Sequence, residues 1–166
     1  AWHLLADQFV KPHGYEGRLI VSGQVMVAEL TNGHDWDTGG VLAYRLSGVD
    51  PACAEPQVDL ARQACSISIH VASSCFEPNL GAHLWDPSWA PHDPWPWLLY
   101  LPTIDGRCAA DAVEVITGVS VRRAVGMAVV VRDAQGRHAG CGLLREVPGV
   151  ASWWHIFTVS WMALPL

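Results

Sequence analysis

Short runs of Val, Ile and other apolar residues recur along the chain, and Gly, Pro, Asn and Asp interrupt them. Helical periodicity is scarce before the last sixteen residues. Short runs of this kind, bounded by turn residues, are typical of an all-β sandwich or barrel. The runs expected to form strands are Gly17–Leu30, Val41–Leu46, Cys65–Val71, Val113–Thr117, Val125–Arg132 and His138–Leu144.

Two segments depart from this pattern. The stretch Phe76–Pro102 is rich in Pro and Trp, which predicts a long loop. The tail Ala151–Leu166 holds no Asp, Glu, Lys or Arg and is apolar on almost every side, at near-helical spacing. Such a segment is buried in its own domain, docked on a partner or placed in a membrane interface, and it is too short to span a bilayer. Its aromatic residues are Trp153, Trp154, Phe157 and Trp161.

The composition indicates that the surface carries few charged residues. The chain has 166 residues, which suits one domain. Charged residues make up 16%, against roughly 25% in typical soluble domains. The net charge is −6, and no basic stretch could follow a phosphate backbone, so nucleic acid is excluded as the expected partner. We therefore expect protein or lipid headgroups to cover part of the surface.

One strand carries candidate chemistry. In "ACSISIHVASSC", polar and apolar residues alternate, so Ser66, Ser68 and His70 are expected to share one face. Two imidazoles two positions apart on one face would supply half of a metal site. Here one of those two positions is Ser68.

Three segments together resemble the copper-only superoxide dismutase family, especially its repeat-type members. They are "YRLSGVDPACAEPQVDLARQACSISIHVASSC", "GAHLWDPSWAPHDPW" and "VGMAVVVRDAQGRHAGCGLL". In that family the corresponding motifs are Gly-Ile-His-Ile-His, a Gly-Gly-His loop, and Val-Val-His followed by Ala-Cys-Gly. The resemblance implies a Greek-key β-barrel or sandwich of the Cu/Zn superoxide dismutase type over residues 17–146. Residues 1–16 would then be an N-terminal extension and residues 147–166 an apolar C-terminal tail.

The resemblance also implies where copper would bind. The four histidine positions of the family map onto Ser68, His70, His83 and Arg132, so only His70 and His83 are left as metal ligands. A serine hydroxyl is a poor ligand at neutral pH. An arginine stays protonated, and its charge opposes a copper ion. The resemblance thus implies a degenerate copper site that has no catalytic residues and holds no cofactor. If the chain binds a metal at all, the resemblance implies that the metal is copper.

Other residues could substitute. His92 and His138 are candidate replacement ligands, and Asp93 could be a ligand or could orient His83 by a hydrogen bond. By spacing, His138 occupies the position of the family's anion-guiding arginine. The alternative is that these histidines only hydrogen-bond within a loop rich in Trp and Pro.

The chain has five cysteines, and whether they form disulfides indicates the cellular compartment in which it folds. The resemblance implies a disulfide between Cys75 and Cys141, and the motif suggests a second between Cys53 and Cys65. Cys108 is left over. Disulfides would place the chain outside the cytoplasm, either secreted or in an organellar lumen, with a peripheral membrane location left open. The alternative is a set of five reduced cysteines.

These observations favour a superoxide dismutase-like pseudoenzyme. It would act as a structural or interaction subunit that contacts other protein subunits of a larger, membrane-associated assembly. Two alternatives stay open: a divergent copper-dependent superoxide dismutase, and a copper-binding protein without turnover.

Overall fold

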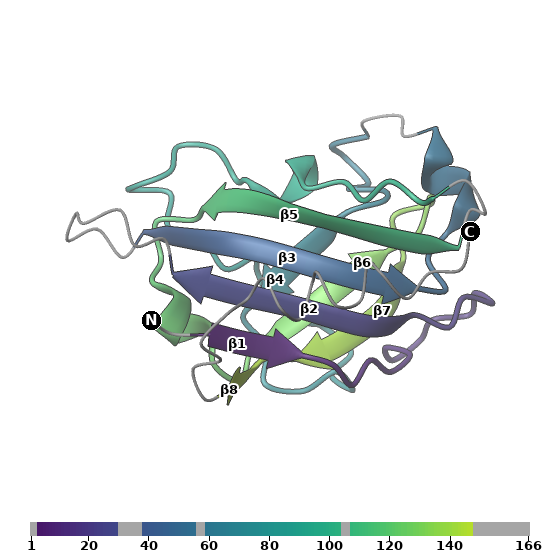
Figure 1. The fold of residues 1–166 in the computed structure, drawn as a ribbon, viewed down its shortest axis with the longest axis horizontal. Helices are drawn as coiled ribbons and strands as arrows, with labels where there is room; N and C mark the ends of the chain where they lie inside the picture. The colour runs from purple at the N-terminus through teal and green to yellow at the C-terminus, as the bar shows by residue number, and fades with distance from the viewer. Residues whose placement is uncertain (1–2, 30–37, 56–58, 104–106, 148–166) are drawn as a thin grey trace, which may run out of the picture.

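The chain forms two antiparallel β-sheets packed face to face (Figure 1). The computed structural model describes residues 3–29, 38–55, 59–103 and 107–147. The large sheet has the strand order β5-β3-β2-β1-β8, and the small sheet has the order β4-β6-β7. The strands are β1 (His3–Ala6), β2 (Ser22–Glu29), β3 (Gly39–Ser47), β4 (Ile67–His70), β5 (Cys108–Ile116), β6 (Ala128–Arg132), β7 (His138–Leu143) and β8 (Arg145–Val147).

Within these described ranges the only helical elements are short 3₁₀ turns, so the expectation of an all-β fold is confirmed. The turns are η1 (Pro51–Ala54), η2 (Trp95–Trp97) and η3 (Val121–Ala124). None of the described helices is long and apolar enough to cross a membrane.

The main core lies between the sheets, and the period-2 pattern of the strands builds it. Ile67 and Ile69 of β4 lie beside their cross-strand partners Val131 and Val129 of β6, and all four enter this core and are at most 2% exposed. The large sheet contributes residues such as Leu42. The opposite face of the small sheet carries Ser68 and His70 of β4 together with a second, smaller cluster of apolar residues. That cluster is Ala72, Cys75, Leu80, Ala128, Val130 and Cys141.

The two sheets are joined along one side by an isolated bridge between Val10 and Cys141, where each residue donates its N–H to the other's carbonyl. At the other side, the segment around Leu99 pairs with the start of β4 through a bridge to Ser66. The ladders of the described residues do not close the two sheets into a barrel. The described residues therefore form an open β-sandwich.

Several strands of the large sheet differ from the sequence-based expectation. The expected strand Gly17–Leu30 begins only at Ser22, and β8 was not expected. The expected strand Val113–Thr117 is the second half of β5, which begins at Cys108 and pairs along its whole length with β3. Within residues 1–16, assigned to an N-terminal extension, β1 lies between β2 and β8 in the large sheet. The tail residues Trp153, Trp154, Phe157 and Trp161 lie outside the described residues.

Candidate functional site

The candidate site lies on the outer face of the small sheet, where β4 presents Ser68 and His70. Because Ile67 and Ile69 enter the core, the alternation of the strand turns Ser68 and His70 to the opposite face. The loop that follows β4 covers this face, so Ser68 is 0% exposed and His70 is 3% exposed. Ser68 and His70 are therefore shielded from water.

Both ring nitrogens of His70 are in use. Its Nδ1 lies 3.1 Å from the carbonyl oxygen of Gly81, which can only accept, so Nδ1 carries the proton. The neutral Nε2 then accepts from the Ser68 hydroxyl at 2.9 Å. Burial, above all, lowers the pKa of His70 to about 4, partly against the effect of the Gly81 carbonyl. The ring is thus neutral at physiological pH, and its free lone pair is already engaged.

His83 lies directly beside His70. The two residues form an isolated β-bridge, and their rings meet edge to face with centroids 4.7 Å apart. Asp93 Oδ2 accepts from His83 Nδ1 at 2.5 Å, while Asp93 Oδ1 accepts from the backbone N–H of Trp95 at 3.0 Å. Asp93 therefore orients the His83 ring, which is the second of the two roles considered for it from the sequence.

Arg132 and His138 complete the cluster from β6 and β7. They are a cross-strand pair at a register shift between Val131 and Arg132. The ring of His138 lies 5.6 Å from that of His70, centroid to centroid. Burial is the main cause that lowers the pKa of His138 to about 4, and the charge of Arg132 adds to it.

Among the described residues, the Arg132 guanidinium donates only to backbone carbonyls. Its Nη1 lies 3.2 Å from the Gly136 oxygen and 3.4 Å from the Arg62 oxygen. Its Nε is buried and has no hydrogen-bond partner. The guanidinium therefore donates no hydrogen bond to His70, His83 or His138.

His92 is not part of this arrangement. Its side chain is exposed, and no ring contact or ion pair joins it to the clustered histidines in the part of the chain that the structure describes. Of the candidates considered from the sequence, the fold brings together Ser68, His70, His83, Asp93, Arg132 and His138.

This donor set does not fit a copper ion. No group of three His, Cys, Asp or Glu side chains among residues 3–29, 38–55, 59–103 and 107–147 is placed to hold a metal ion. The nitrogen of His70 that would bind a metal accepts from Ser68 instead. The positive charge of Arg132 stands at the position implied for a further ligand, where it opposes any cation.

Two disulfides tie the loops to the small sheet, and both pairs are those expected from the resemblance. Cys75 bridges to Cys141 on β7, with the Cα atoms 5.7 Å apart, and fastens the covering loop over the site. Cys53 bridges to Cys65, also at 5.7 Å between the Cα atoms. Within the described residues Cys108 is the free cysteine. Two disulfides indicate an oxidising environment outside the cytoplasm.

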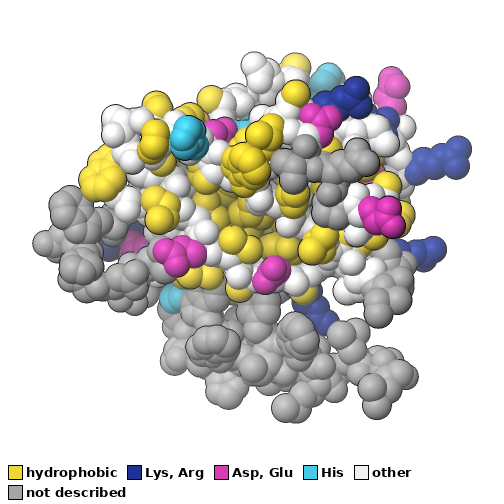
Figure 2. Space-filling model, turned by 90° about the horizontal axis from the view of Figure 1, so that it is seen from above, with side chains coloured by type: hydrophobic (Ala, Val, Ile, Leu, Met, Phe, Trp, Pro, Cys, Tyr) yellow, Lys and Arg dark blue, Asp and Glu magenta, His cyan; other side chains and the backbone are white. Residues whose placement is uncertain are grey.

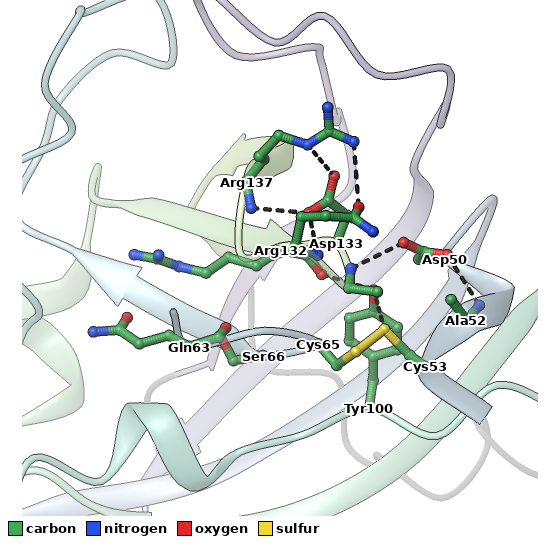
Figure 3. The surroundings of a disulfide bond; sticks show 12 residues. Asp50, Ala52, Cys53, Gln63, Cys65, Ser66, Tyr100, Arg132, Asp133 and Arg137 are labelled. Atoms are coloured by element: carbon green, nitrogen blue, oxygen red, sulfur yellow. Dashed lines mark hydrogen bonds and ion pairs between the residues drawn. A yellow bond between two sulfur atoms is a disulfide. The ribbon is translucent and has the colours of Figure 1, made fainter. Parts of the chain in front are cut away.

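Around the Cys53–Cys65 disulfide lies a polar network that the sequence did not reveal (Figure 3). The Tyr100 hydroxyl donates to the Arg132 carbonyl at 2.7 Å and lies 3.3 Å from Cys53 Sγ. Asp133 is 0% exposed and accepts from the Arg137 side chain at 2.8 Å. The only signal in the sequence was the turn "DAQG" itself, which does not show that Asp133 is buried. This network fixes the backbone from which the Arg132 side chain projects.

Comparison with known proteins adds no relative: no protein-family model and no curated protein matches the chain.

Proposed function

We propose that this chain is a catalytically inactive, superoxide dismutase-like module that serves as an interaction subunit of a larger extracytoplasmic assembly at a membrane. The observation that carries the proposal is the hydrogen bond from Ser68 Oγ to His70 Nε2, at 2.9 Å. It occupies the lone pair that a metal would need. Redox catalysis by copper requires several imidazole ligands, and these residues do not supply them.

Several structural features support the dismutase-like part of the proposal. β4, β6 and β7 lie side by side, so the segments that carry the resemblance meet on one sheet. His70 and His83 are in contact, and Asp93 orients His83. The Cys75–Cys141 disulfide joins the loop to β7. All of these are expected of a chain that kept the framework of such a site and lost its metal ligands.

The surface supports the interaction part. On the face drawn in Figure 2, hydrophobic side chains gather around a hollow and charged side chains are scattered at its edges. Several large hydrophobic side chains are exposed, and an apolar patch on a protein surface marks an interaction site when its residues are contiguous. The exposed side chains include Phe76 at 68%, Trp97 at 60%, Leu101 at 58% and Trp89 at 53% exposure.

Metal analysis of the purified full chain tests the inactive part of the proposal. After incubation with excess copper and desalting, we expect well below one copper per chain and no dismutase activity. About one copper per chain with turnover would establish the divergent enzyme instead. About one copper without turnover would establish a copper-binding protein.

A truncation tests the interaction part. The apolar tail 151–166 supplies the attachment to the assembly in this proposal, since Trp side chains suit a protein interface or the headgroup layer. Removing it is expected to leave a folded domain that no longer co-purifies with membranes or with its partners. A truncated chain that unfolds would show that the tail belongs to the domain's own core, and the attachment role would be wrong.

A further inference from the structure

β5 is a long edge of the large sheet that no other strand of the described residues covers. It pairs with β3 over all nine residues from Cys108 to Ile116, without a shift in register. The other sheet edges are short or covered: β8 has three residues, Leu99 and His83 bridge to the β4 edge, and Val10 bridges to β7. A long free edge presents backbone groups that can pair with another strand, so native proteins usually shorten, bend or cover it.

Every second residue of β5 directs its backbone groups away from β3. The Gly48 N–H donates to the Arg107 carbonyl at 2.9 Å, and the Thr117 N–H donates to the Thr38 carbonyl at 3.0 Å. Because the register is continuous between these two bonds, the odd-numbered residues of β5 bond to β3. The even-numbered residues therefore point their N–H and carbonyl groups to the open side. Those that are exposed there are Ala110, Ala112, Glu114 and Ile116.

Exposed apolar side chains lie at both ends of this edge. Ile116 ends β5, and a Cβ added at Gly118 would lie 2.6 Å from Trp89 Cβ. At the start of the strand, Leu101 lies two residues before Thr103, whose N–H donates to the first carbonyl of β5. Ile116, Trp89 and Leu101 are each more than half exposed. β5 is the uppermost strand in Figure 1, so Figure 2 looks onto this side, where hydrophobic side chains gather around a hollow. A strand added here would bury apolar surface as well as form hydrogen bonds.

The charges of the edge determine which kind of strand fits. β5 contains two acidic residues, Asp111 and Glu114, and no basic one. Neither carboxylate forms an ion pair within residues 3–29, 38–55, 59–103 and 107–147. Pairing with β5 of a second copy would bring like charges onto neighbouring strands, with no basic residue of β5 to offset them. Because the two acidic residues are three positions apart, they lie on opposite faces of the sheet. A strand that compensates both needs two basic residues at the same spacing.

We propose that the free edge of β5 binds an extended segment of a partner protein, which adds a strand to the large sheet and carries two basic residues three positions apart. Its backbone pairs with the even-numbered residues of β5, and its basic side chains lie opposite Asp111 and Glu114. The Asp111 carboxylate, which accepts from the Ala112 N–H at 2.7 Å, then releases this N–H to the added strand. This inference rests on the interaction role proposed above and names a partner chemistry for it, at a surface separate from the tail.

The probe is the synthetic peptide Thr-Lys-Val-Thr-Arg-Val-Thr with blocked ends, titrated into the isotope-labelled full chain and followed by nuclear magnetic resonance. The control peptide has Glu in place of Lys and Arg. With the basic peptide we expect saturable changes in the amide signals of β5. Hydrogen exchange is expected to slow several-fold for the amides of Ala110 and Glu114. The amides of Val113 and Val115 should change little, because they already bond to β3. The acidic peptide should produce neither effect.

Charge reversal tests the selection of the partner. In the double variant Asp111→Lys with Glu114→Lys, affinity for the basic peptide is expected to fall at least about fivefold, because two attractive cross-strand pairs become repulsive. The same variant should bind the acidic peptide better than the unaltered chain does. Glu146→Lys, at an exposed position of β8 on the opposite edge of the sheet, is the matched control and should bind as the unaltered chain does.

A proline tests the backbone pairing. Ala112→Pro removes an N–H that does not bond to β3 and places a ring on the open side, so it is expected to abolish binding of the basic peptide. The inference is overturned if the basic peptide causes no saturable change, if both peptides bind alike, or if the changes centre outside β5. Should Ala112→Pro not fold, the charge reversal decides. The experiment involves neither copper nor the tail, so its failure is distinct from a failure of the metal analysis or of the truncation.

Discussion

The imidazole ring of His70 meets that of His83 at nearly a right angle, 89°, with the ring centroids 4.7 Å apart. Each ring is held by its own acceptor, the Gly81 carbonyl for His70 and the Asp93 carboxylate for His83. Two imidazoles are thus pre-positioned side by side. In the function proposed above, the pair lacks a metal because Ser68 and Arg132 stand where the resembling family has histidine.

Replacing those two neighbours by histidine should create a metal site. The double variant Ser68→His with Arg132→His removes the hydroxyl that occupies His70 Nε2 and the opposing cation, and it adds two imidazoles. We expect copper uptake near one ion per chain, measured by elemental analysis after desalting. Ser68→His alone keeps the Arg132 charge and should take up much less. A double variant that binds no more copper than the unaltered chain would show that the aligned positions are wrong.

Acid should destabilise the fold through His70 and His138. Their pKa values in the folded chain are about 4, against about 6.5 when unfolded. Between these values the unfolded chain binds more protons, so the free energy of unfolding falls as the pH drops from about 6.5 to 4. From pH 7 to pH 5 we expect a loss on the order of 1–2 kcal/mol for each of the two histidines, measured by urea denaturation.

A variant separates this effect from general acid denaturation. His138→Asn keeps a polar side chain of similar reach but does not titrate, so it should lose roughly half as much stability between pH 7 and pH 5. Equal losses in His138→Asn and in the unaltered chain would mean that His138 is not the titrating group.

Alkylation should mark a single thiol. With the chain denatured and no reductant present, we expect iodoacetamide to label Cys108 alone, because the other four cysteines are paired. After reduction, five labels are expected. Mass spectrometry of the peptides checks both results, and labelling of Cys75 and Cys141 without reductant would contradict the disulfide between them.

Two glycines allow a matched test of the turn that holds Arg132. Gly136 and Gly126 both have φ near +80°, where an alanine is strained by about 1–2 kcal/mol. A Cβ at Gly126 would meet nothing within 4 Å, whereas at Gly136 it would lie 2.2 Å from the Arg62 carbonyl oxygen. We therefore expect Gly136→Ala to lower the free energy of unfolding by about 1–3 kcal/mol more than Gly126→Ala. Equal effects in urea denaturation would mean that the turn shifts freely away from Arg62.

Several features could be predicted from the sequence by itself. The alternation in residues 65–71 determined that Ser68 and His70 share a face, because side chains of a strand alternate with period 2. The short apolar runs, with the turn "DAQG" between the last two, determined the positions of β4, β6 and β7 closely. The segments of the resemblance also implied both cysteine pairs found in the structure.

Other features depended on contacts between residues far apart in the chain. Residues 108–112, "CAADA", have little β propensity, and they form the start of β5 because they pair with β3. β1 is only four residues long and is stabilised by pairing with β2 and β8 on either side. Local sequence does not encode such pairings, so neither the first half of β5 nor β1 was expected from it.

The state of the site was also decided by tertiary structure. The sequence identified Ser68 and Arg132 as substitutions, but the tautomer of His70 depends on the carbonyl of Gly81, eleven residues away. Likewise, Arg132 Nε has no hydrogen-bond partner, while Nη1 donates to the carbonyls of Gly136 and Arg62. Gly136 lies in a turn and Arg62 in a loop, and the two meet only in the folded chain. Residue identity determined which charges and donors this protein carries. Burial and long-range packing decided which of them are satisfied, because hydrogen bonds and desolvation depend on position in space rather than on order along the chain.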